Sequence, residues 1–177
     1  MTLNLKRPLH AIALPLACSL LVACGDGGGG GDDGSGTLPT INTYATGWLQ
    51  GQCNVVGGVS SSRFLLTVTK IADNSVSYTQ RGVQYMGTAC AGTGTVSPTA
   101  TNMGSVTFLA TEGHGGVTFN RGSWTRPPGI TSPVIWALKT RNRLCLFSDG
   151  TPTAFPTAKN VADYTATLLN EICYDRQ

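Results

Sequence analysis

A basic segment in the C-terminal half holds the residues best suited to binding a charged ligand. Lys139, Arg141 and Arg143 lie close together in a chain in which 12% of residues are charged. On a β-strand, the two-residue period would place the three cations on one face, where they could bind phosphate or carboxylate groups. At a hairpin tip they would form a solvated turn, and the flanking apolar runs favour this second interpretation. Trp124 and Arg126, upstream, complete the candidate ligand-binding set.

Residues suited to catalysis or metal binding are sparse. The chain has two histidines, and His114 lies in the run Glu112–Gly116, which is typical of a hairpin tip rather than of a preorganised site. There is no G-x-S-x-G nucleophile motif, and no cysteine pair has zinc-site spacing with a histidine nearby. The sequence therefore predicts no catalytic residue, no metal site and no cofactor.

Residues 1–23 have the layout of a secretory signal. Lys6 and Arg7 precede an apolar run from Leu9 to Ala23 that is too short to span a bilayer. The run ends in Leu21-Val22-Ala23-Cys24, which resembles the lipobox of bacterial lipoproteins. An ordinary secretory signal is the alternative interpretation.

The lipobox resemblance implies how the chain is attached to a membrane. It implies cleavage before Cys24, a diacylglyceryl group on the Cys24 thiol and acylation of the new amino group, and durable anchoring requires two or more acyl chains. The residue after Cys24 is Gly25 and not Asp. Under the sorting rule of enteric-type lipoproteins, this implies the outer membrane rather than the inner one. Residues 24–36 are then the lipidated cysteine and a glycine-rich tether that has too few side chains to build a core.

Four cysteines fall in the remaining segment, residues 37–177, which is predicted to be one domain. They are Cys53, Cys90, Cys145 and Cys173. An even number in an exported chain predicts disulfides, with three possible pairings. The favoured pairing joins Cys53 to Cys90 and Cys145 to Cys173, because each bridge then fastens one half of the domain and neither crosses the other.

The hydrophobic pattern of this domain predicts an all-β fold. Alternating runs at 64–71 and 76–81, separated by Asp73-Asn74, predict a hairpin, and further hairpins are expected at 106–119 and 134–147. Pro127, Pro128 and Pro133 are expected to bracket a loop, and residues 159–169 fit either a short helix or a strand. The pattern therefore predicts an antiparallel up-and-down barrel or barrel-like sandwich of about eight strands, with at most one short C-terminal helix.

The order of several short motifs resembles a known family. Thr46-Gly47-Trp48 precedes Cys53, Tyr85 precedes Cys90, Leu144–Gly150 surrounds Cys145, and the chain closes on Cys173–Arg176. This order resembles the small lipocalin-like, or calycin-like, lipoproteins of Gram-negative bacteria over most of residues 43–176. The resemblance implies an antiparallel barrel with Trp48 at its closed end, beneath Arg176 from the last strand.

Composition narrows the function. A formal net charge of +3 without dense Lys/Arg clusters argues against nucleic-acid binding, and a 41% apolar content is enough for a packed core. The leading prediction is a membrane-anchored, non-enzymatic domain of the cell envelope that binds a small apolar or anionic ligand or an envelope partner. A structural accessory with a solid interior is the alternative, and an inhibitor or hydrolase is a weaker one. A cavity lined by aromatic side chains would favour ligand binding over the accessory role.

Overall fold

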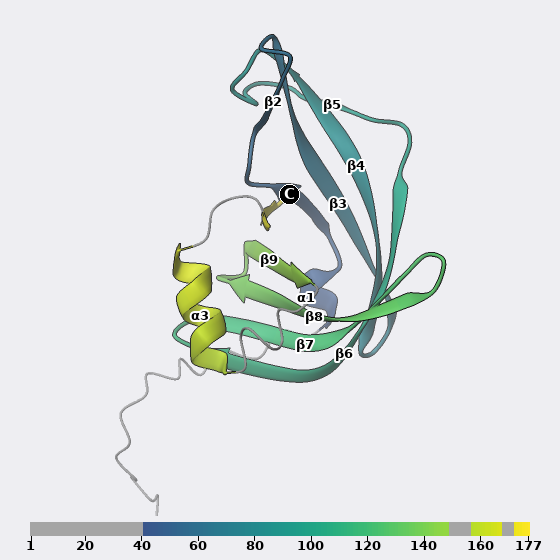
Figure 1. Cartoon of the computed structure of the whole chain (residues 1–177), viewed down its shortest axis with the longest axis vertical. Helices are drawn as coiled ribbons and strands as arrows, with labels where there is room; N and C mark the ends of the chain where they lie inside the picture. Colours follow the sequence, from purple (N-terminus) through teal and green to yellow (C-terminus); the bar gives the residue numbers. More distant parts are fainter. Residues whose placement is uncertain (1–40, 149–156, 168–171) are drawn as a thin grey trace, which may run out of the picture. The chain divides into compact units, whose positions relative to one another are not determined.

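The computed structural model describes residues 41–148, 157–167 and 172–177. Within them, eight antiparallel strands form a closed barrel: β1 (Gly47–Gln50), β3 (Ser60–Ala72), β4 (Ser75–Met86), β6 (Thr101–His114), β7 (Val117–Arg126), β8 (Ile130–Lys139), β9 (Arg143–Ser148) and β10 (Cys173–Arg176). Pairing of β3 with β4 closes the ring, and chain neighbours pair around it in up-and-down order (Figure 1). The predicted all-β barrel is confirmed.

Four smaller elements accompany the barrel. β2 (Asn54–Val56) pairs with the beginning of β3, and β5 (Thr95–Val96) pairs with the last part of β4. The β3–β4 hairpin therefore has a short strand on each side at the end away from its turn (Figure 1). The helices are α1 (Ile41–Tyr44) and α3 (Ala158–Thr167). α3 settles the helix-or-strand alternative in favour of a helix as far as Thr167, and residues 168 and 169 lie outside the described part of the chain. In the described part of the chain, no helix has the length and apolar character needed to cross a membrane.

The predicted hairpins are confirmed, with two corrections. The run Glu112–Gly116 is mostly strand, because pairing of β6 with β7 continues to His114 and Val117. The turn is reduced to Gly115 and Gly116, whose φ angles of 56° and 75° suit glycine at a tight hairpin. Pro133 lies inside β8, opposite Ser123, rather than at the edge of a loop. The chain therefore reverses at 127–129, and β7 and β8 form a hairpin that was not predicted because the prolines indicated a loop.

Apolar side chains cluster on both faces of the barrel wall. The interior holds the largest cluster, which includes Trp48, fully buried, with the Arg176 guanidinium 6.0 Å from its ring centroid. A second cluster, which includes Phe119 and Ile135, takes in Val161 and Ala162 of α3. Because neighbours along a strand point to opposite faces, Ile135 and Trp136 belong to different clusters, and α3 covers part of the outer wall.

Both predicted disulfides are present. Cys53 is bonded to Cys90 and Cys145 to Cys173, with Cα–Cα distances of 5.7 and 4.0 Å. Cys145 and Cys173 face each other on β9 and β10 and are buried in the outer cluster beneath α3. Each bridge lies outside the barrel interior, so neither occupies space in which a ligand could bind.

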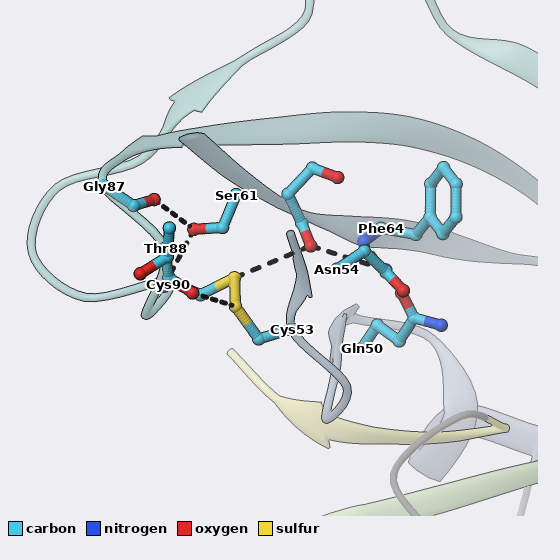
Figure 2. The surroundings of a disulfide bond; sticks show 9 residues. Gln50, Cys53, Asn54, Ser61, Phe64, Gly87, Thr88 and Cys90 are labelled. Carbon is cyan, nitrogen blue, oxygen red and sulfur yellow. Dashed lines mark hydrogen bonds between the residues drawn. A yellow bond between two sulfur atoms is a disulfide. The ribbon is translucent and has the colours of Figure 1, made fainter. Parts of the chain in front are cut away.

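The surroundings of the Cys53–Cys90 bridge are held by a buried serine. The Ser61 hydroxyl donates to the Gly87 carbonyl at 2.8 Å and accepts from the Cys90 N–H at 2.9 Å (Figure 2). Cys90 has a φ of 48°, which is uncommon for a residue other than glycine. The serine contacts and the bridge together hold the segment after β4 in place.

Candidate functional site

A cavity of about 200 Å³ lies inside one end of the barrel. We call it the aromatic cavity, because four of its lining residues are Tyr78, Trp124, Trp136 and Tyr174. The others are Leu66, Gln80, Met103, Val134, Leu146 and Ile172. Several of these side chains are only partly buried, so the cavity reaches the surface. They come from seven barrel strands and from Ile172 just before β10, so the closed ring of strands is what brings them together.

Trp136 separates the aromatic cavity from the packed half of the interior. Its ring makes edge contacts with Tyr78, centroid to centroid at 5.4 Å, and with Tyr44 and Phe108, each at 5.6 Å. Tyr78 lines the cavity, whereas Tyr44 and Phe108 do not. Such contacts favour fixed ring positions, so the cavity has a rigid inner wall.

The end of the barrel beyond Trp136 is filled. Tyr44 of α1 is fully buried, and its hydroxyl donates a hydrogen bond to the Asn120 side chain, which in turn donates to Thr111. The indole N–H of Trp48 donates to the Tyr44 carbonyl at 2.9 Å. α1 therefore closes this end, and the buried polar groups there satisfy one another.

Three polar groups line the aromatic cavity: two tyrosine hydroxyls and one amide. Among the described residues, no hydrogen bond joins the Tyr78 hydroxyl, the Tyr174 hydroxyl or the Gln80 amide to another group. Burial raises the pKa of Tyr78, the nearby Tyr174 raises it further and Arg126 partly opposes the shift; burial also raises the pKa of Tyr174. Both hydroxyls therefore stay protonated near neutral pH and can donate hydrogen bonds into the cavity.

A glycine bulge positions the cavity wall. Gly104 lies opposite Tyr78, where the register between β4 and β6 shifts, and its φ is 96°. The indole N–H of Trp124 donates to the neighbouring Met103 carbonyl at 2.7 Å, and the Arg126 guanidinium lies 4.9 Å from the Trp124 ring centroid. Strand β7 thus places a cation–π pair beside the cavity.

The structure divides the sequence-predicted ligand-binding set between the two ends of the barrel. Trp124 lines the aromatic cavity and Arg126 stacks on it. Trp124 pairs with Ser132, whereas Lys139 pairs with Val117 at the other end of β7, roughly 23 Å away at about 3.3 Å per strand residue. The two groups of residues therefore do not form one site.

The three basic residues lie around the β8–β9 turn, as the favoured interpretation predicted. Lys139 ends β8 and donates to the Thr165 carbonyl of α3 at 3.4 Å. Arg143 begins β9 and pairs with Asp175 at 3.2 Å, and Arg141 lies exposed between them. The turn is solvated, and two of its cations bind neighbouring protein groups.

Sequence reasoning missed most of the cavity. Tyr78, Gln80, Met103 and Tyr174 were not candidates, although alternation along β4 places Tyr78 and Gln80 on the same face as the buried Val76. That alternation was the available signal. It could show that these side chains share a face, but not that the face lines an unfilled part of the interior.

Two other hollows among the described residues are less suited to a small organic ligand. One of about 330 Å³ runs past Gly104 and Arg126, and one of about 400 Å³ lies near Asp73 and Phe108. The first has no aromatic lining residue and the second has one. His114 is exposed at the end of β6, and the described residues contain no group of three potential metal ligands among His, Cys, Asp and Glu.

Fold and cavity together define a closed eight-stranded antiparallel barrel with one filled end and an aromatic cavity at the other, an architecture compatible with the lipocalin-like fold. No protein-family model matches the chain, and comparisons with curated proteins and with solved structures likewise find no match. The residues and geometry of the site therefore have to indicate the function.

Proposed function

We propose that this protein is an exported, lipid-anchored member of the lipocalin-like type whose barrel binds a small molecule in the aromatic cavity. The observation that carries the proposal is the cavity, because a structural accessory with a solid interior would not need one. Small-molecule sites are concave and mostly apolar, with a few polar groups that orient the ligand. The aromatic cavity has this composition, with Gln80, Tyr78 and Tyr174 as its polar groups.

Partly filling the cavity is expected to weaken binding. Leu146 lines the cavity from β9, directly opposite Trp136 in the register, and is partly buried. Leu146→Phe should fill part of the free volume and weaken binding of the hydrocarbon indane at least tenfold, measured by isothermal titration calorimetry. Leu146→Met is the matched control, because it conserves volume and should bind as the unmodified protein does. Equal affinity in all three proteins would contradict the proposal.

The anchor proposal rests on Leu21-Val22-Ala23-Cys24 and on the glycine-rich tether that follows. It places the domain at the envelope, with the outer membrane favoured by Gly25. A tether of this composition would hold the barrel near the membrane while leaving it free to turn toward a ligand.

Replacing the proposed acceptor thiol provides the test. Cys24→Ser is expected to abolish incorporation of an alkyne-labelled fatty acid and to leave the chain at its unprocessed mass, since the thiol would be the acceptor and cleavage would follow acylation. Cys18→Ser, inside the predicted signal, is the control and should be labelled and processed normally. Labelling that persists in the Cys24→Ser chain would contradict the anchor.

A further inference from the structure

We propose that the aromatic cavity selects a compact, uncharged molecule of one or two rings that carries an oxygen acceptor, with Tyr78 and Tyr174 donating hydrogen bonds to that oxygen. This inference rests on the proposed ligand-binding function and adds to it the chemical class of the ligand. Size, ring contacts, polar groups and charge each support it.

The volume of the cavity limits the size of the ligand. Pockets for drug-sized ligands span about 300–1,000 Å³, and an engineered apolar cavity of about 150 Å³ binds benzene. A cavity of about 200 Å³ lies between these values and suits one or two rings. It could not enclose a long acyl chain or a lipid headgroup with its sugars.

The walls of the cavity suit a flat ligand. Tyr78 and Trp136 meet edge to face with an interplanar angle of 80°, and Tyr78 and Trp124 lie at 39° with their centroids 6.2 Å apart. Rings held at such angles present both a face and edges to a ligand ring. Each favourable aromatic pair contributes binding free energy beyond that of apolar surface burial. Met103, beside Trp124, can adapt to the outline of the ligand.

The tyrosine hydroxyls supply selectivity for an acceptor. They lack protein partners among the described residues, so an apolar ligand that displaced water would leave them unsatisfied. Sites built to hydrogen-bond a ligand discriminate strongly against analogues that lack the bonding group, because their own polar groups then remain unpaired. A ligand oxygen that accepts from both hydroxyls removes this penalty.

The charge of the lining favours a neutral ligand. None of the ten residues that line the aromatic cavity is ionised at neutral pH, since the tyrosines remain protonated. Arg126 is held against Trp124 and interacts electrostatically with Tyr78, so its positive field favours a partly negative oxygen over a bare hydrocarbon. A ring ketone has these properties.

Two bicyclic compounds of nearly equal shape separate this inference from the proposed function. Calorimetric titration of the purified protein with 1-indanone and with indane should show about tenfold tighter binding of the ketone, as two neutral hydrogen bonds would give. Tyr78→Phe and Tyr174→Phe should each reduce the preference to about threefold, and the double variant should abolish it. Tyr85→Phe is the control, because Tyr85 is buried in a cluster outside the barrel, and it should keep the full preference.

The outcomes separate the two ideas. Equal affinity for indane and 1-indanone in the unmodified protein would overturn the ligand class while leaving binding in the cavity intact. A preference that survives in the double variant would also overturn it. Failure of both compounds to bind would contradict the proposed function together with this inference.

Discussion

Reduction of both disulfides is expected to lower the free energy of unfolding by about 7.5 kcal/mol. In the chain-entropy model, the Cys53–Cys90 and Cys145–Cys173 bridges contribute about 4 and about 3.5 kcal/mol, because each removes the freedom of a long loop from the unfolded chain. Domains of this size are commonly stable by about 5–15 kcal/mol, so the loss should approach complete unfolding. Urea titration with and without reductant measures it.

Variants with one bridge removed serve as controls. Cys53→Ala with Cys90→Ala, and Cys145→Ala with Cys173→Ala, should each lose about half of the total. Since both bridges lie outside the interior, a variant that remains folded should still bind indane in the aromatic cavity. A total loss below 2 kcal/mol would show that the bridges add little to the barrel.

Substitution of Gly104 by alanine is expected to be the most damaging single change among the glycines of the barrel wall. An alanine Cβ there would lie 2.0 Å from the Thr125 carbonyl oxygen, and the φ of 96° is unsuited to a side chain. Strain at such a φ and forced displacement of a backbone each cost on the order of 1–3 kcal/mol, so about 3–5 kcal/mol of stability should be lost. Thermal unfolding followed by circular dichroism provides the measurement.

Gly82→Ala is the matched control. Gly82 lies in β4, where an added Cβ meets nothing within 4 Å, and its φ is not in the left-handed region. Its substitution should change stability by less than about 1 kcal/mol. Because Gly104 lies opposite Tyr78 and next to Met103, any Gly104→Ala protein that folds should also lose affinity for 1-indanone. Similar melting temperatures for the two variants would refute the role assigned to the bulge.

The fold was largely predictable because its signals are local. Alternation at 64–71 and 76–81 predicted the β3–β4 hairpin, and the number and spacing of the cysteines favoured the observed pairing. Where a local rule failed, pairing with a neighbour overrode it. Pro133 lies within β8 because that strand pairs with β7, and Glu112 continues β6 because β6 pairs with the other side of β7.

The site was less predictable because it depends on register. Trp124 was a candidate on its chemistry alone, yet its partners Tyr78 and Tyr174 come from segments almost a hundred residues apart, and only the closed ring of strands brings them into one cavity. Register also explains the separation of Arg126 from Arg141 and Arg143, which the sequence grouped together. Alternation predicts on which side of the barrel wall a side chain lies, but not its position along the barrel axis.

The short strands beside the β3–β4 hairpin bear on self-association. Closing the ring gives every barrel strand a neighbour on both sides, and in the described part of the chain the strands at the two ends of the sheet order are β2 and β5, three and two residues long. Edges this short offer little template for cross-strand aggregation. This holds even though Val59 and Met86, at the same end of the β3–β4 hairpin, are 78% and 93% exposed. Copies crowded on a membrane, as the proposed anchor implies, could therefore collide at this end of the hairpin without forming a continuous intermolecular sheet.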